Sequence, residues 1–220
     1  MNLNFKKKTS FSGKSQSMII FLHGYGADAS DLIPIADTIT KVLPDTLFLA
    51  PDAPNQCQSN PFGRQWFPIP WLDSSSESES EKILMESTEI LNNFINTMCA
   101  VEKIPVENTV LFGFSQGTMI GLHLMPNRKA PFAAIVGFSG RVVKPKAFDE
   151  VQGAKTPVLL VHGDQDQMVD PKYLDEAAGI LKAAQYSVQS YVSSGTGHGI
   201  APDGLKVAVD FLRKILYQHG

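Results

Sequence analysis

A short motif in the middle of the chain offers a nucleophile. Residues 113–117 are Gly-Phe-Ser-Gln-Gly, a G-x-S-x-G pattern centred on Ser115. The apolar run Thr109–Phe114 predicts a strand, and Gln116–Met125 predicts a helix. A serine in so sharp a strand-to-helix turn is held out at the edge of the sheet, where its hydroxyl can attack a carbonyl carbon. The flanking glycines fit, because side chains there would collide with the helix and the neighbouring strand.

The base for this serine is predicted to be a histidine near the C-terminus. A serine hydroxyl needs a base to take its proton, and an acid to orient that base. With this motif the partners follow in the chain order serine, acid, histidine. Of five histidines, only His198 and His219 lie after the downstream acidic residues. His219 is the penultimate residue, where chains fray, whereas His198 lies in a glycine-rich loop after a predicted strand. We therefore predict His198.

The acid is predicted in the segment His162–Val169, directly after another predicted strand. Asp164 and Asp166 both qualify by position, and the residues alone do not separate them. Asp166 lies deeper in the loop and has more freedom to turn toward the base. A calcium loop is excluded, because Met168 and Val169 stand where a ligand and a glycine are needed. No metal site is predicted here.

Two backbone N–H groups are predicted to form an oxyanion hole, which stabilises the negative oxygen formed during acyl transfer. One is the N–H of Gln116, directly after the nucleophile. The other comes from the loop after the early strand Met18–Leu22, where glycines allow close approach of the backbone. Tyr25 is the candidate donor, and His23 is assigned a structural role because it precedes the turn.

Two segments resemble phosphate-binding motifs, but each lacks a residue that its motif requires. Residues 24–29 match a loose G-x-G-x-x-A pattern, but Asp52, the acidic partner, lies too far along the chain and between prolines. Gly13-Lys14-Ser15 resembles the end of a P-loop, but Lys8 stands where the first glycine is required. No nucleotide or other cofactor is expected.

The elements that must position these residues alternate between strands and helices. Several strands are continuous apolar runs, typical of strands buried on both faces of a parallel sheet. The predicted strands are Met18–Leu22, Thr46–Ala50, Thr109–Phe114, Ala133–Phe138, Pro157–His162 and Ser187–Val192, and further helices are predicted over 81–98, 171–184 and 203–218. The order predicts an α/β fold with a mostly parallel sheet, helices on both faces and ligand sites at the carboxyl ends of the strands.

The segment Pro51–Ser80 does not fit this alternation. It is rich in proline, serine and glutamate and holds both tryptophans, Trp66 and Trp71. Long structureless loops in compact domains are usually functional or disordered. One interpretation is a surface loop whose aromatic residues lie against the core. The other is a mobile flap that lines an apolar substrate pocket.

Composition narrows the class of protein further. The 220 residues suit one domain, 1–220, and a net charge of −3 argues against a dedicated nucleic-acid binder. No apolar run approaches the length of a membrane span, and the N-terminus lacks the apolar stretch of a secretory signal. Two cysteines form no disulfide framework, which favours a reduced, cytoplasmic setting.

Four segments together resemble the carboxylesterase/phospholipase family that includes acyl-protein thioesterases. They are LHGYGADASDL at 22–32, GFSQG at 113–117, HGDQDQMV at 162–169 and GHG at 197–199. The resemblance extends over about 18–216 and implies a serine hydrolase with a compact α/β-hydrolase fold and no large cap domain. It implies Ser115, His198 and Asp166 as the catalytic triad, supports Tyr25 and Gln116 as oxyanion donors, and places Trp66 near the acyl group.

Three positions depart from the family pattern. Thr118 replaces a second glycine after the nucleophile and is expected to crowd the start of the helix. Pro68 stands where an acidic residue is usual, which affects the local conformation of the flap. Residues 140–147 match poorly, so the substrate preference of the family is not carried over.

The resulting hypothesis is a serine esterase for apolar acyl chains. Trp66, Phe67 and Met168 are the substrate-binding candidates. Esters, thioesters (including acylated proteins) and lysophospholipids all suit this chemistry. The alternative is a lipid- or membrane-binding module with weak or lost catalysis, because the aromatic segment 62–71 is of the kind that favours interfaces.

Overall fold

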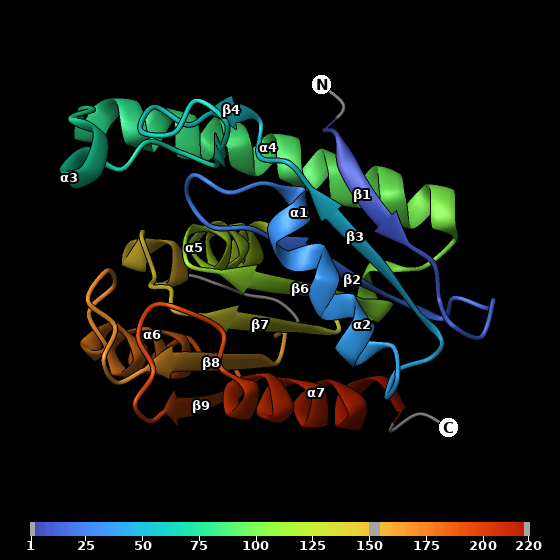
Figure 1. Ribbon diagram of the computed structural model, residues 1–220. Coiled ribbons are helices and arrows are strands. Elements are labelled where there is room, and N and C mark those ends of the chain that lie inside the picture. Colours follow the sequence, from blue (N-terminus) through green and yellow to red (C-terminus); the bar gives the residue numbers. More distant parts are fainter. Residues whose placement is uncertain (1–2, 150–154, 218–220) are drawn as a thin grey trace.

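The computed structural model describes residues 3–149 and 155–217 and has a seven-stranded sheet at its centre (Figure 1). The strands are β1 (Phe5–Lys8), β2 (Ser17–Leu22), β3 (Thr46–Pro51), β6 (Thr109–Phe114), β7 (Ala134–Phe138), β8 (Val158–Gly163) and β9 (Val188–Ser193). Their order is β1-β3-β2-β6-β7-β8-β9, and every pairing is parallel except that of β1 with β3. The predicted α/β fold with a mostly parallel sheet is confirmed.

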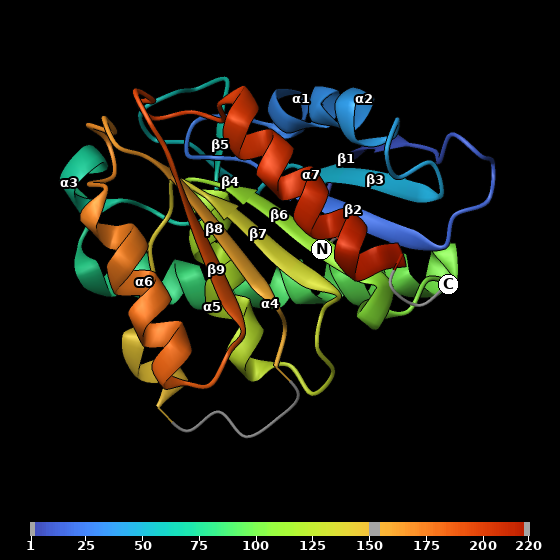
Figure 2. The same ribbon diagram turned by 90° about the horizontal axis from the view of Figure 1, so that it is seen from below.

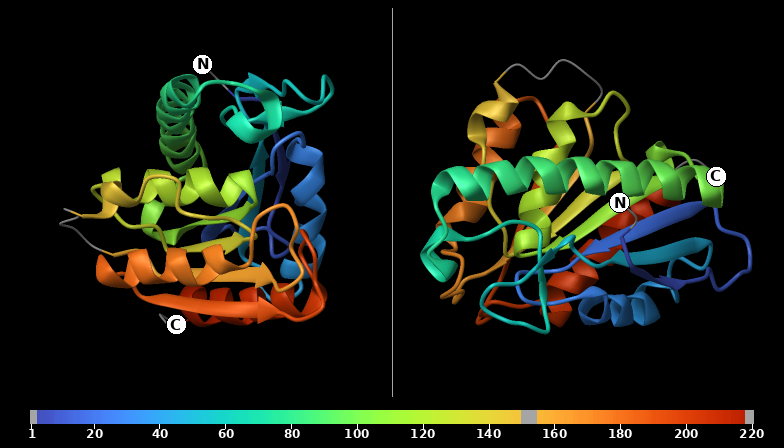
Figure 3. Two further views of the ribbon diagram at one scale, coloured as in Figure 1. Left: turned by 90° about the vertical axis from the view of Figure 1, so that its left-hand side faces the viewer. Right: turned by 90° about the horizontal axis from the view of Figure 1, so that it is seen from above.

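Helices cover both faces of the sheet (Figures 2 and 3). They are α1 (Ala29–Leu32), α2 (Ala36–Ile39), α3 (Pro70–Asp73), α4 (Glu77–Glu102), α5 (Gln116–Leu124), α6 (Lys172–Ala183) and α7 (Pro202–Tyr217), with 3₁₀ turns at Ile33–Ile35, Val106–Asn108, Met125–Asn127 and Pro145–Phe148. Helices α4, α5 and α6 pack on one face, and α1, α2 and α7 pack on the other. No helix of the described residues is long and apolar enough to cross a membrane.

The two apolar layers explain why the strands lack polar alternation. Along β2, Ile20 and Leu22 face the layer with α4 and α5, while Ile19 and Phe21 face the layer with α1 and α7. All four side chains are buried. Burial on both faces therefore requires an apolar residue at each position, as the continuous runs predicted.

The segment 51–80 is more ordered than predicted. It contains a small hairpin of β4 (Asn55–Gln56) and β5 (Arg64–Gln65), the short helix α3 and the first turn of α4. Helix α4 begins at Glu77 rather than near residue 81, because the Ser76 hydroxyl accepts a hydrogen bond from the Glu79 N–H at 3.1 Å. A serine cap followed by acidic residues stabilises a helix N-terminus.

Candidate active site

Ser115 lies at a strained turn between β6 and α5. Its backbone has φ 53° and ψ −116°, a conformation that a non-glycine residue holds only where the surroundings impose it. A Cβ on Gly113 would lie 2.5 Å from the Thr118 nitrogen, and one on Gly117 would lie 1.8 Å from the Leu22 carbonyl oxygen. Both glycines are therefore required by close backbone approach, as the motif predicted.

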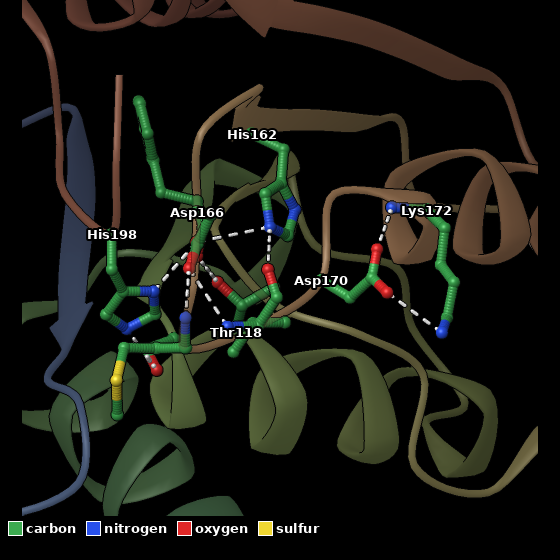
Figure 4. Close-up of polar contacts among 10 residues, drawn as sticks. Thr118, His162, Asp166, Asp170, Lys172 and His198 are labelled. Atoms are coloured by element: carbon green, nitrogen blue, oxygen red, sulfur yellow. Dashed lines mark hydrogen bonds and ion pairs between the residues drawn. The ribbon is translucent and has the colours of Figure 1, made fainter. Parts of the chain in front are cut away.

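The structure brings Ser115, His198 and Asp166 together from three separate loops. His198, in the loop between β9 and α7, places Nε2 3.0 Å from the Ser115 Oγ and Nδ1 2.8 Å from the Asp166 Oδ2. Asp166 lies in the loop after β8. Figure 4 shows the His198 ring beside the Asp166 carboxylate. The three side chains form one continuous chain of hydrogen bonds.

The Asp166 carboxylate is held in its ionised form. Burial alone would raise its pKa, but hydrogen bonds from the Val169 N–H, the His198 ring and the Met168 N–H outweigh burial and hold the pKa below its ordinary value. The two N–H groups each donate to Oδ1 at 2.9 Å, which leaves Oδ2 to His198. An ionised carboxylate only accepts, so the His198 Nδ1 carries the proton and Nε2 is free to accept from the serine.

Asp164, the other candidate acid, stabilises a turn instead. Its carboxylate accepts hydrogen bonds from the Gly195 N–H at 2.7 Å and the Ser194 hydroxyl at 3.2 Å. These contacts fix the loop that carries His198. The structure thus separates the two acids that the sequence left open: Asp166 contacts His198, and Asp164 supports the loop.

His162 is a second histidine beside the triad that the sequence analysis did not assign. Its Nε2 donates to the Val169 carbonyl oxygen at 2.9 Å and lies 3.3 Å from the Asp166 Oδ2 (Figure 4). The ring is buried at the end of β8. His162 therefore holds the loop that aims Asp166. Its position at the end of a predicted strand, directly before the acidic loop, was the available signal.

The loop after β2 approaches the nucleophile closely. A Cβ on Gly24 would lie 3.4 Å from the Ser115 Cβ. Next to Tyr25, the Gly26 N–H donates to the Arg64 carbonyl oxygen at 2.9 Å. The Gln116 N–H lies in the first turn of α5, where backbone N–H groups have no partner within the helix. Tyr25 and Gln116 thus lie on the two backbone segments that flank Ser115.

The Tyr25 side chain connects this loop to α3. Its hydroxyl donates to the Asp73 Oδ2 at 3.0 Å, and the same oxygen accepts from the Ile69 N–H at 2.8 Å. Burial raises the pKa of Tyr25 above its ordinary value, so the hydroxyl stays protonated and can donate. The oxyanion loop and the segment around α3 are therefore linked by one carboxylate.

Trp66 is enclosed in the interior of the fold. Its side chain is 0% exposed, and its indole N–H donates to the His23 carbonyl oxygen at 3.0 Å. The Gln116 side chain binds the same segment: Oε1 accepts from the Trp66 N–H at 2.8 Å, and Nε2 donates to the Phe67 carbonyl oxygen at 2.7 Å. Phe67 is also buried. Both residues tie the 66–67 segment to the nucleophile turn and the oxyanion loop.

Met168, the third substrate-binding candidate, lies in a groove beside the triad. The groove has a volume of about 610 Å³ and is lined by Trp71, Met119, Arg141, Asp166, Gln167, Met168, Val169, Asp170 and Tyr173. Met168 and Trp71 are 59% and 58% exposed. Trp71 rather than Trp66 is thus the tryptophan of this groove, a distinction that the sequence could not make.

His23, which precedes the turn after β2, and Asp52, the acidic residue of the rejected nucleotide pattern, both have structural partners. The His23 Nε2 accepts a hydrogen bond from the Ala53 N–H at 3.0 Å, and burial lowers the pKa of this histidine. The Asp52 carboxylate accepts from the Ala29 N–H at 2.8 Å, at the start of α1. Within 3–149 and 155–217, no cluster of three His, Cys, Asp or Glu side chains could hold a metal ion.

Thr118 fits beside the nucleophile turn because small residues face it. Its hydroxyl donates to the Phe138 carbonyl oxygen at 2.9 Å. A Cβ on Gly137 or Gly140 would come within 2.5 or 2.4 Å of the Thr118 side chain. The threonine therefore fills space left by two glycines at the end of β7, and the expected crowding of the helix is accommodated there.

This packing predicts a coupled pair of substitutions. Gly140→Ala alone is expected to destabilise the fold by about 2 kcal/mol, since the added methyl group overpacks against Thr118. Thr118→Gly alone loses a buried hydrogen bond and places glycine, a poorer helix former than threonine, inside α5, which costs about 2 kcal/mol. The double variant should lose about 1 kcal/mol less than the sum of the two, measured by urea unfolding. Strict additivity would show that the two positions do not compete for space.

Comparison with known protein families shows to which family this sequence and its site belong. The sequence profile of the phospholipase/carboxylesterase family matches residues 8–216. The chain belongs to this family. Membership and the hydrogen-bonded Ser115, His198 and Asp166 make it a serine hydrolase of the carboxylesterase type.

Individual relatives of this chain match it over most of their length. The crystal structure of esterase PE8 superposes with a TM-score of 0.92 at 36% identity, covering 98% of this chain and 100% of that one. Esterase YpfH of Escherichia coli is 24% identical over 93% of this chain and 85% of its own. Acyl-protein thioesterase 1 of Kluyveromyces lactis is 28% identical over 98% and 99%.

Proposed function

We propose that the chain hydrolyses carboxylic esters through an acyl-enzyme on Ser115. The single observation that carries this proposal is the hydrogen-bond chain from Ser115 through His198 to Asp166. The Ser115 oxygen attacks the ester carbonyl carbon while His198 Nε2 takes the hydroxyl proton. The same proton then passes to the departing alcohol or thiol, and the acyl group stays on the serine.

The second half of the reaction repeats the first with water. His198 takes a proton from water, the hydroxide attacks the acyl carbon, and the proton returns to Ser115 as the acid leaves. In both halves the carbonyl oxygen carries negative charge. The backbone N–H groups of Tyr25 and Gln116 are proposed to bind this negative oxygen. Asp166 stays ionised and stabilises the protonated His198 ring.

The groove beside the triad supports an apolar group on the substrate. The exposed side chains of Trp71 and Met168 offer it aromatic and thioether surface. We propose carboxylic esters and thioesters with short to medium acyl chains as the substrate class. Relatives named acyl-protein thioesterase support the thioester part of this proposal, with acylated proteins as one source of such substrates; lysophospholipids suit the same chemistry.

A chain-length series tests the site. Trp71→Ala is expected to lower kcat/KM for hexanoyl and octanoyl esters and thioesters about tenfold more than for acetyl ones, because the groove loses apolar contact with the chain. Trp66→Ala is the matched control. This substitution should lower kcat/KM by the same factor for every acyl-chain length, since Trp66 is buried and its indole holds the oxyanion loop through the His23 carbonyl oxygen. Length-dependent loss in the Trp66 variant alone would reassign the acyl site.

Membrane contact through residues 62–71 is a separate proposal that does not replace catalysis. Phe62 is 91% exposed, and Trp71 is the other exposed ring of this segment, whereas Trp66, Phe67 and Ile69 are buried. We propose that the two exposed rings contact lipid surfaces when the substrate is an acylated protein or a lipid. The free cysteines Cys57 and Cys99 suit the reducing cytoplasm that we propose as the setting.

A further inference from the structure

Arg141 stands out among the residues of the groove beside the triad. It follows Gly140, whose position is so close to the nucleophile turn that a Cβ there would lie 3.1 Å from the Ser115 carbonyl oxygen. The other members of the groove are uncharged, or their charges are already paired. A cation in this position can meet a substrate that is bound for attack by Ser115.

Two aromatic rings hold the Arg141 guanidinium. Its central carbon lies 4.7 Å from the centroid of the Trp71 ring and 5.1 Å from that of the Tyr173 ring. Its Nη1 donates to the Tyr173 hydroxyl at 3.3 Å. Stacking on ring faces leaves the in-plane N–H groups as the part of a guanidinium that can bind an anion. The side chain is thus preorganised for an acceptor of matching planar shape.

The charge of Arg141 is not balanced within the described part of the chain. The Asp170 carboxylate pairs with the Lys172 ammonium at 2.9 Å and accepts a hydrogen bond from the Lys172 backbone N–H at 3.0 Å (Figure 4). Asp166 is engaged by His198. No ion pair joins Arg141 to a carboxylate among residues 3–149 and 155–217. The Arg141 Nε is also buried without a hydrogen-bond partner among them.

We propose that Arg141 determines specificity by binding a carboxylate carried by the ester substrate. The inference rests on the proposed esterase function and names the substrate class more narrowly: an ester with a second, anionic end. A carboxylate is favoured over a phosphate, because one unbalanced positive charge matches a monoanion and the planar fork of arginine fits its two oxygens. The apolar surface of Trp71 and Met168 would contact the methylene groups between the ester and the carboxylate.

Matched ester pairs test the proposal. One series compares monoethyl esters of straight-chain dicarboxylic acids with ethyl esters of monocarboxylic acids of equal carbon number, by ethanol release. A second series compares acetate esters of hydroxy acids with acetates of simple alcohols, which places the carboxylate on the alcohol side. The measured quantity is the ratio of kcat/KM for the anionic ester to that for its neutral partner, at low and high salt.

Arg141→Gln is expected to lower the best ratio about 10-fold to 100-fold, the effect of losing a charge-assisted hydrogen-bond pair. The loss should appear mainly as a higher KM, because the contact with the carboxylate is made equally in the bound substrate and in the transition state. Arg141→Lys keeps the charge without the planar fork and should recover only part of the ratio. Arg213→Gln removes the same charge from an exposed position on α7 and should leave the ratio unchanged.

The outcomes separate this inference from the proposed function. An unchanged ratio in both series, in Arg141 variants that still hydrolyse esters, would overturn the role of Arg141 and leave the esterase intact. Hydrolysis that survives Ser115→Ala would overturn the proposed function itself. Calorimetric binding of the monoethyl esters to the Ser115→Ala protein, with and without Arg141→Gln, reports the carboxylate contact without turnover. Equal affinity in that pair would also contradict the proposal.

Discussion

Ser115→Ala is expected to lower kcat for ester hydrolysis by about 10⁶, as loss of the nucleophile does in comparable triad enzymes. His198 and Asp166 would remain hydrogen-bonded to each other, but no hydroxyl would be left to form the acyl-enzyme. The fold should change little, because the strained turn is imposed by close backbone approach at Gly113 and Gly117 rather than by the serine hydroxyl. Thermal unfolding within a few degrees of wild type would verify this.

Ser139→Ala is the matched control. Ser139 is also a buried serine at positive φ, 48°, and its hydroxyl has no hydrogen-bond partner among the described residues. A fluorophosphonate, which modifies an activated serine, should label the wild type and the Ser139 variant on Ser115 and leave the Ser115 variant unlabelled. Near-wild-type turnover without Ser115, or labelling elsewhere, would refute the assignment of the nucleophile.

The fold was predictable because its strongest signals are local. The six predicted strands recur with shifts of at most one residue at their ends. Five of them are apolar runs buried on both faces, whereas β9 is a partly exposed strand at the edge of the sheet. The loops that carry the site follow the carboxyl ends of β2, β6, β8 and β9. Parallel topology alone therefore brings Ser115, Asp166 and His198 to one edge of the sheet, although 83 positions separate the serine from the histidine.

Strand β1 and the start of helix α4 were missed for identifiable reasons. Strand β1, Phe5–Lys8, is an exposed edge strand of sequence FKKK, and its lysines hide any apolar pattern while suiting an unpaired edge. The start of α4 was placed too late, although Ser76 and Glu79 have the spacing of a capping box. The predicted unstructured stretch was therefore partly an acidic first turn of a helix.

The groove could not be predicted from the sequence, because burial separates residues of one type. Trp66 and Trp71 lie five positions apart, yet one is enclosed beneath the oxyanion loop and the other borders the groove. Arg141 lies in a segment with no recognisable motif, and its importance depends on two rings from α3 and α6. The chemistry of the triad is thus set by motifs, whereas the choice of substrate depends on contacts between distant segments.

The second large effect is expected from Asp166→Asn, which should lower kcat by about 10⁴ near neutral pH, the loss typical of a wrong histidine tautomer. The Met168 and Val169 N–H groups donate to the Asp166 Oδ1, so an asparagine must keep its carbonyl oxygen there. Its NH₂ group then faces the His198 Nδ1 and donates to it. His198 would hold its proton on Nε2, where it cannot accept one from Ser115.

Asp164→Asn is the matched control, because it makes the same change two residues earlier. An asparagine there can still accept from the Gly195 N–H through its carbonyl oxygen, and the Ser194 hydroxyl can turn to accept from its NH₂ group. The loop that carries His198 should therefore hold, with a loss in kcat below about tenfold. Equal losses in the two variants, or a larger loss in the Asp164 variant, would move the acid role away from Asp166. Circular dichroism and thermal unfolding of both variants distinguish a loss of kcat caused by misfolding from one caused by the changed histidine tautomer.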